Sequence, residues 1–145
     1  MVDFQSMPLG GIIKARRVFK TRHFARWMRK TELTDAALCE AVQEMSLGLL
    51  DADLGSGLVK KRVGMAGRGK RGGARTLVAT NKNKRWFFVF GLEKNERANI
   101  DADELEALQE LAEQLLVRSN EELEVALADG ALKEICHEHS SQNKK

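Results

Sequence analysis

The sequence contains no tyrosine, a single proline and no apolar run approaching the roughly 18–20 residues of a membrane-spanning helix, so no membrane partner is expected. Its first residues show no basic region followed by an apolar one, and no secretory signal is expected. The two cysteines, Cys39 and Cys136, lie far apart and form no Cys-x-x-Cys pair. Two free thiols in a reducing, cytoplasmic setting are therefore the default expectation.

Potential metal ligands are few and scattered. His23 stands alone in the sequence, while His137 and His139 lie in a polar C-terminal stretch. A protein metal site needs several ligands gathered at one point. Neither a metal nor another cofactor is therefore expected.

Acidic residues are missing from a long central window, because none lies between Leu54 and Leu92. Residues 1–92 carry 18 Lys and Arg against 7 Asp and Glu, whereas residues 93–145 carry 6 against 14. The formal charges of the two parts are therefore +11 and −8, which combine to the net +3 of the chain. The chain has 145 residues, the length of one ordinary domain. Such a separation of positive from negative charge within one domain predicts that a polyanion binds the basic part.

The densest basic stretch is KKRVGMAGRGKRGGAR, residues 60–75, which holds seven basic residues and five glycines without one carboxylate. Glycine lets backbone N–H groups approach an anion closely, and Lys and Arg supply point charges and bidentate forks. The stretch is not a Walker loop, because it lacks the Gly-x-x-x-x-Gly-Lys-Ser/Thr spacing and leads into a strand pattern. It suits a sugar–phosphate backbone; the alternative is a solvated hairpin.

Hydrophobic periodicity predicts the order of elements along the chain. The expected elements are a strand within residues 11–21, helices from Arg22 and after the cap Thr34, strands at 58–66, 74–80 and 85–92 joined by the turn NKNK, and helices capped by Asp101 and Ser119. This order predicts an α+β fold, in which a small antiparallel β-meander packs against N-terminal helices and C-terminal helices.

The expected domain organisation follows from the same pattern. Residues 1–10 are expected to form a flexible N-terminus, 11–130 a single domain, and 131–145 a polar, disordered tail. Within the last strand of the meander, alternation predicts Trp86, Phe88 and Phe90 on one face, with Phe87 and Val89 on the other. Because both faces are apolar, this strand is expected to be central and covered on both sides.

Two segments, GLVKKRVGMAGRGKRGGARTLV and RWFFVFGLEKNERANIDADELEAL, closely resemble the RelE/HigB-like toxins of bacterial type II toxin–antitoxin systems, within the RelE/ParE superfamily. The specific motif is Lys-x-Arg-x-x-x-x-Gly-x-Gly-Lys-x-Gly-Gly-x-Arg, matched from Lys60 to Arg75, and KNERANI follows at residues 94–100. The resemblance covers roughly residues 15–118. It implies a ribosome-dependent endoribonuclease that cuts mRNA without a metal and is held inactive by an antitoxin of helix-turn-helix type.

The resemblance also implies the functional residues, which are carried over position by position. The catalytic candidates are Lys60, Arg62, Lys70 and Arg75, and the candidate RNA contacts are Lys61, Arg68, Arg71, Phe90 and Lys94. Guanidinium groups can stabilise the charge of a pentacovalent phosphate, and Arg75 is the expected clamp. A lysine among other cations loses its proton more readily, so Lys60 or Lys70 is expected to act as base or acid.

Some relatives place a Tyr or a His near the end of the last strand, where this chain has Leu92 and Glu93. Phe90 can stack on a base there, but it cannot transfer a proton. Two other functions fit the same fold: a non-catalytic nucleic-acid-binding module of ribosomal or nucleoid type, and a gyrase-inhibiting, ParE-like toxin. Convergent Lys and Arg residues on the sheet favour the nuclease, because a gyrase inhibitor does not need them.

Overall fold

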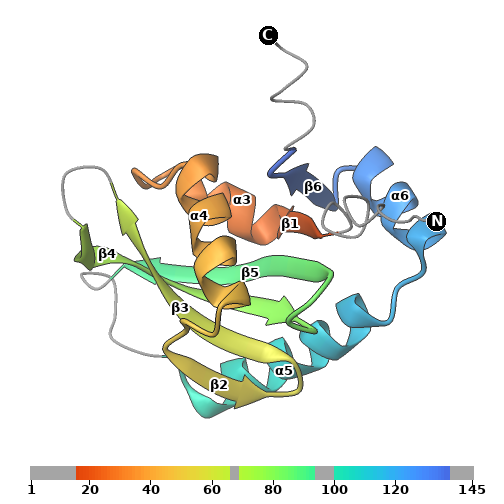
Figure 1. The fold of residues 1–145 in the computed structure, drawn as a ribbon. Coiled ribbons are helices and arrows are strands. Elements are labelled where there is room, and N and C mark those ends of the chain that lie inside the picture. The colour runs from red at the N-terminus through yellow and green to blue at the C-terminus, as the bar shows by residue number, and fades with distance from the viewer. Residues whose placement is uncertain (1–15, 66–68, 94–99, 138–145) are drawn as a thin grey trace, which may run out of the picture.

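The fold is described from a computed structural model, which covers residues 16–65, 69–93 and 100–137, without the side chains of 69–72 (Figure 1). The expected flexible N-terminus, residues 1–10, lies outside this part of the chain. The elements are β1 (Arg17–Thr21), α3 (Arg22–Met28), α4 (Asp35–Ser46), β2 (Ala52–Gly55), β3 (Leu58–Met65), β4 (Gly69–Thr80), β5 (Arg85–Glu93), α5 (Ala102–Leu116), α6 (Asn120–Ala128) and β6 (Leu132–Ile135).

The strands form one six-stranded sheet in the order β2-β3-β4-β5-β1-β6. The predicted antiparallel meander is confirmed for β3, β4 and β5, and β2 extends it from a segment that the sequence presents as a turn-rich connection. β1 pairs with β5 in parallel, so the sheet is mixed. β6 pairs antiparallel with β1, and the expected boundary at residue 130 is therefore wrong for the four residues of β6.

The predicted helix starts are confirmed in detail. Thr34, Asp101 and Ser119 are the N-caps of α4, α5 and α6, and each side chain accepts a hydrogen bond from a backbone N–H of the first turn. In the capping box of α5, Asp101 Oδ1 accepts from the Glu104 backbone N at 2.8 Å, and Glu104 Oε1 accepts from the Asp101 N at 3.0 Å. These local bonds satisfy N–H groups that the helix itself leaves unpaired, and so fix where each helix begins.

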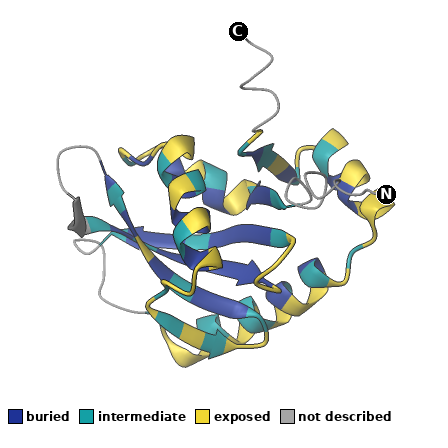
Figure 2. Cartoon of the chain, in the orientation of Figure 1, coloured by how far each residue is buried: buried dark blue, intermediate teal, exposed yellow. Residues whose placement is uncertain are grey.

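The sheet is buried between two helical layers, as Figures 1 and 2 show. α3 and α4 cover one face and pack against Trp86 and Phe88 of β5. α5 and α6 cover the other face and pack against Phe87 and Val89. The prediction of a central strand with two apolar faces is therefore confirmed for β5, which lies between β4 and β1.

The predicted position of Phe90 is wrong, and a β-bulge is the reason. Leu77 of β4 pairs with Phe90, whereas the next residue, Val78, pairs with Phe88, so Val89 is an extra residue in β5. A bulge reverses the alternation beyond it. Phe90 consequently joins Val89 on the α5 face, while a Cβ on Gly91 would overlap the Trp27 ring on the α3 side.

The expectation of free thiols is also wrong. Cys39 of α4 and Cys136, which follows β6, are joined by a disulfide across 97 residues of sequence. The fold brings them together because β6 returns to the edge of the sheet beside β1, where Ile135 and Cys136 pack against the α4 layer. The pair Arg17–Glu134 also links β1 to β6, with Nε–Oε2 and Nη2–Oε1 distances of 2.9 and 2.8 Å, and raises the pKa of Arg17.

Removal of the disulfide should lower the free energy of unfolding, because the cross-link restricts the conformational entropy of the unfolded chain. A cross-link closing a loop of nearly 100 residues stabilises a domain by about 4–5 kcal/mol in the chain-entropy description. Cys39→Ser, Cys136→Ser and the double variant should each lose about this much free energy of unfolding, measured by urea denaturation. The oxidised parent should lose a similar amount on addition of dithiothreitol, whereas the double variant should not respond. Two titratable thiols in the untreated parent would contradict the cross-link.

Candidate nucleic-acid interface

Two rows of paired residues cross the sheet on the face covered by α5. In the first row Lys60 of β3 pairs with Leu77 of β4, which pairs with Phe90 of β5. In the second, Arg62 pairs with Arg75, which pairs with Leu92. Neighbouring strands lie about 4.8 Å apart, so the register alone brings Lys60 and Arg75 close to each other.

Lys60 and Arg75 line one cavity, of about 270 Å³. Both are half-buried. The other described residues of the lining are apolar: Leu54, Leu77, Leu92, Ile100 and Leu105. Apolar walls exclude water and strengthen the attraction between a bound anion and the two cations. Because Ile100 and Leu105 come from the start of α5, that helix completes the cavity.

Arg62 is placed differently, although it lies directly opposite Arg75 in the β3–β4 ladder. It is exposed, and its Nε lies 3.5 Å from Asp51 Oδ2. It lines a separate hollow with Glu40 and Glu44 of α4. Like charges placed opposite one another destabilise a ladder, and Asp51 offsets part of this cost at Arg62. The structure therefore brings Lys60 and Arg75 together and leaves Arg62 at their flank.

Lys61 does not belong to this interface, and its expected role in RNA binding needs correction. Its residue exposure is 5%, and its Nζ lies 2.8 Å from Glu44 Oε1 and donates to the Leu49 carbonyl at 2.8 Å. Strand alternation turns it toward α4, away from Lys60. Lys61 therefore ties β3 to α4.

The remaining candidates cannot all be placed. Arg68 and Lys94 lie outside the described residues, and Lys70 and Arg71 belong to β4 by their backbone only. The strand expected at 58–66 is confirmed as β3, which ends at Met65, whereas β4 begins at Gly69 and not at residue 74, so that Met65 pairs with Gly69. A Cβ on Gly73 would overlap the Val63 carbonyl oxygen, so this glycine serves the close approach of two strands.

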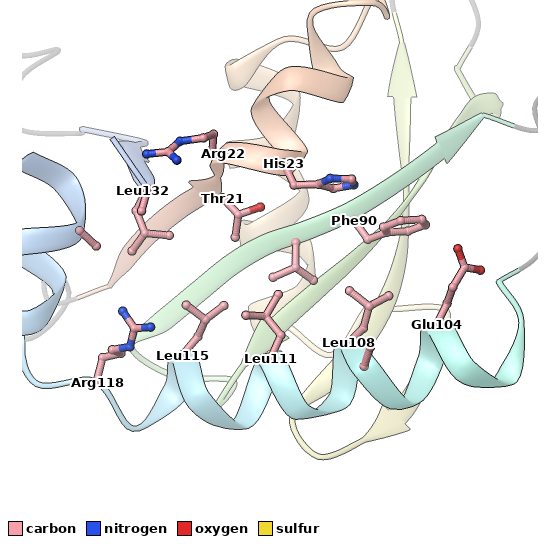
Figure 3. Close-up of a pocket in the computed structure, with 14 residues that line it drawn as sticks. Thr21, Arg22, His23, Phe90, Glu104, Leu108, Leu111, Leu115, Arg118 and Leu132 are labelled. Atoms are coloured by element: carbon pink, nitrogen blue, oxygen red, sulfur yellow. The ribbon is translucent and has the colours of Figure 1, made fainter. Parts of the chain in front are cut away.

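A second hollow, of about 480 Å³, runs between α5 and the junction of β1 with α3 (Figure 3). Leu108, Leu111 and Leu115 point into it from α5. On the opposite side the ring of His23 stacks on Phe90, with centroids 5.7 Å apart and planes 7° apart. The apolar stripe of α5 is thus only partly covered, because Leu108 and Leu111 are half-buried.

His23 is the residue that sequence reasoning missed at this site. It is 67 positions from Phe90 in the sequence, and nothing in the local pattern joins the two. They meet because β1 runs parallel to β5 and ends beside the bulge, so that the first turn of α3 lies against Phe90. No sequence signal indicates this contact, because it depends on the parallel pairing of β1 with β5, which leaves no periodic pattern in the sequence.

The described residues contain neither a cluster of metal ligands nor a helix that could span a membrane. No group of three or more His, Cys, Asp or Glu side chains in residues 16–65, 69–93 and 100–137 is placed to hold a metal ion. None of the described helices is both long and apolar enough to cross a membrane.

Comparison with known families identifies the family of the chain. Residues 16–135 match the family described as the RelE toxin of the RelE/RelB toxin–antitoxin system. The chain belongs to the RelE toxin family. It is thus a toxin of a toxin–antitoxin system, with an antitoxin as its partner. A search of curated proteins finds no match to the chain.

The RelE match extends through β6 to residue 135, further than the motifs that carry the sequence resemblance. It therefore includes β1, α3 and β6, the elements that place His23 beside Phe90 and close the edge of the sheet. The RelE match accordingly includes every described strand of the sheet, from β1 to β6.

Lys60 and Lys61 offer a matched pair for separating binding from stability. Lys61→Met should lower the free energy of unfolding by about 2 kcal/mol, less than for a fully buried ion pair because Glu44 keeps some exposure. Its affinity for a single-stranded RNA oligonucleotide should not change. Lys60→Met should show the reverse pattern, a loss of affinity with little change in stability. Urea denaturation and fluorescence anisotropy measure the two quantities, and equal losses of affinity would contradict the placement of Lys61.

Proposed function

We propose that this toxin is a ribosome-dependent endoribonuclease that cuts mRNA by metal-independent attack of the ribose 2′-hydroxyl. The observation that carries the proposal is the cavity shared by Lys60 and Arg75. A half-buried Arg and Lys that share a cavity with the apolar side chains described above suit a phosphodiester, whose negative charge increases as the attack proceeds. A gyrase inhibitor has no need of such a cavity.

In the proposed reaction the 2′-oxygen attacks the neighbouring phosphorus, and the bond from phosphorus to the 5′-oxygen breaks. The products are a 2′,3′-cyclic phosphate and a free 5′-hydroxyl. One group must accept the proton of the 2′-hydroxyl and another must protonate the leaving 5′-oxygen. Arg75 is the proposed clamp on the phosphate, because a β-strand holds its backbone rigidly and guanidinium forms bidentate contacts with phosphate.

Lys60 is the proposed proton-transfer group within the cavity, with Lys70 as the second candidate. The chain has no tyrosine for this task. Phe90, one strand beyond Leu77 in the row of Lys60, offers its ring to a base of the transcript. Arg62, which lies beside the cavity, is proposed to contact a neighbouring phosphate, and the family resemblance extends this proposal to Arg68, Arg71 and Lys94. Action on ribosomes places the toxin in the cytoplasm, where a helix-turn-helix antitoxin is the proposed inhibitor covering the Lys60–Arg75 cavity.

Arg75→Ala should abolish cleavage while the protein remains folded. Removal of one donor from a preorganised anion site typically costs 100-fold or more in rate. After induction in bacterial cells, the parent should arrest growth and produce cuts within translated mRNA, mapped by primer extension. Arg75→Ala should produce neither effect. Lys84→Ala, an exposed cation in the β4–β5 turn, is the control and should behave as the parent does.

Two outcomes would contradict the nuclease proposal. If Arg75→Ala arrests growth as strongly as the parent, Arg75 is not the clamp. If the parent arrests growth with intact mRNA and instead inhibits DNA supercoiling by gyrase, the toxin acts as a ParE-like protein. Circular dichroism of purified Arg75→Ala verifies that the variant is folded.

Phe90 should contribute through its ring. Stacking of a base on an aromatic side chain is worth about 1–3 kcal/mol. Phe90→Leu should therefore reduce cleavage of translated mRNA by about tenfold, whereas Phe90→Trp, which keeps a ring, should retain most of it. The measurement is the fraction of a translated reporter mRNA cut per unit time in a reconstituted translation reaction. Equal activity of the two variants would exclude base stacking at Phe90.

A further inference from the structure

A second group of cations lies apart from the Lys60–Arg75 cavity. It surrounds a hollow of about 260 Å³ and consists of Lys20, Arg22, Arg26, Arg29 and Lys133. These residues come from β1, α3 and its C-cap, and β6. Thr21, Ala25 and Gly130 complete the lining, which contains no carboxylate among the described residues. We name it the β1–α3–β6 pocket.

The helix α3 gathers three of these charges by its spacing alone. Arg22, Arg26 and Arg29 follow one another at intervals of four and three residues, so they share one face of the helix. Like charges at these spacings destabilise a helix. Lys133 adds another positive charge from the edge strand β6. An anion in the pocket would relieve this repulsion.

Internal partners neutralise only part of the pocket. Lys20 Nζ lies 2.8 Å from Asp35 Oδ1, and Arg22 donates to the carbonyl oxygens of Asp129 and Gly130 at the end of α6. Arg26, Arg29 and Lys133 are exposed, and none of them forms an ion pair with another residue in the described part of the chain. Three cations therefore face the pocket without a carboxylate.

The pocket adjoins the hollow in which His23 stacks on Phe90. Thr21 and Arg22 line both, and Figure 3 shows Arg22 directly before His23 at the start of α3. Three strand spacings of about 4.8 Å separate β3, which carries Lys60, from β1. The lateral separation is therefore about 15 Å. Lys20 and Lys133 lie on the α3–α4 face of the sheet and Lys60 lies on the α5 face. The path therefore also turns around the end of β1, where Thr21 and Arg22 line both hollows. Several nucleotides of single-stranded RNA cover this path, within the site sizes of proteins that bind single strands.

We propose that the β1–α3–β6 pocket binds a backbone phosphate of the same RNA strand that is held at Lys60 and Arg75. The strand passes over Phe90 and His23 between the two clusters. This inference rests on the proposed function, since it extends the RNA-binding surface of that site. Three arginines favour phosphate, because guanidinium forks pair with its oxygens in two contacts at a time.

The test compares two double variants that remove the same charge. Arg26→Ala/Arg29→Ala removes two cations from the pocket, and Lys30→Ala/Lys84→Ala removes two exposed lysines that do not line it. The probes are fluorescein-labelled 2′-O-methyl oligouridylates of 4 and 12 nucleotides, which cannot be cleaved through the 2′-oxygen. Affinity is measured by anisotropy over a range of salt concentrations.

The pocket variant should bind the 12-mer about tenfold more weakly than the parent and bind the 4-mer equally well. Its slope of log affinity against log salt should fall by up to ~1.4, because each phosphate contact on a single strand contributes about 0.7. The control variant should retain the parental 12-mer affinity. Equal losses in both variants, or no loss in the pocket variant, would overturn the proposal.

A second arm separates the bound strand from ribosomal RNA, which carries the same phosphate chemistry. Co-sedimentation with 70S ribosomes is measured for the same two variants. A loss confined to ribosomes, with 12-mer affinity intact, would overturn the assignment and place ribosomal RNA in the pocket. Neither arm depends on cleavage. If Arg75→Ala proves as toxic as the parent while the pocket variant still loses affinity for the 12-mer, the pocket stands and the nuclease proposal fails.

Discussion

The structure depends on a sheet that holds like charges next to one another. Arg62 and Arg75 lie opposite each other in the β3–β4 ladder, and Lys60 lies two residues from Arg62 on the same strand. Their mutual repulsion opposes the pairing, and the buried apolar residues that alternate with them outweigh it. Leu58, Val59, Val63, Leu77 and Val78 are all at most 5% exposed. Because the cores on both faces keep the sheet intact, the three cations stay close together despite this repulsion.

A single extra residue links this charged surface to an aromatic one. Without the bulge at Val89, Phe90 would face α3 with Trp86 and Phe88, and the α5 face would present Gly91 in its row. With the bulge, Phe90 extends the row of Lys60 and Leu77 and meets His23. The bulge thus sets cations and a stacking ring side by side, which is the combination found in proteins that bind single-stranded RNA.

Local physics explains what the sequence predicts well. The caps Thr34, Asp101 and Ser119 and the hairpin turn before β5 depend on residues a few positions apart, and they are confirmed. The errors lie where distant segments meet. The parallel pairing of β1, the return of β6, the Cys39–Cys136 disulfide and the contact of His23 with Phe90 leave no periodic trace in the sequence. Alternation along β3 predicts that Lys60 and Lys61 lie on opposite faces of the sheet. The burial of Lys61 cannot be predicted in the same way, because it depends on Glu44 in α4.

Most of the exposed acidic residues described in the C-terminal part of the chain lie on the helices α5 and α6. The carboxylates of α5 and α6 that are exposed to solvent, Asp103, Glu106, Glu110, Glu113, Glu121, Glu122 and Glu124, belong to the same helices whose apolar residues pack on the sheet. They give the outer side of this layer a charge that repels RNA. The cations of β3, β4, α3 and β6 carry the opposite charge elsewhere on the molecule. Under the proposed function, this separation orients an approaching strand before contact and favours the path between the two cationic pockets.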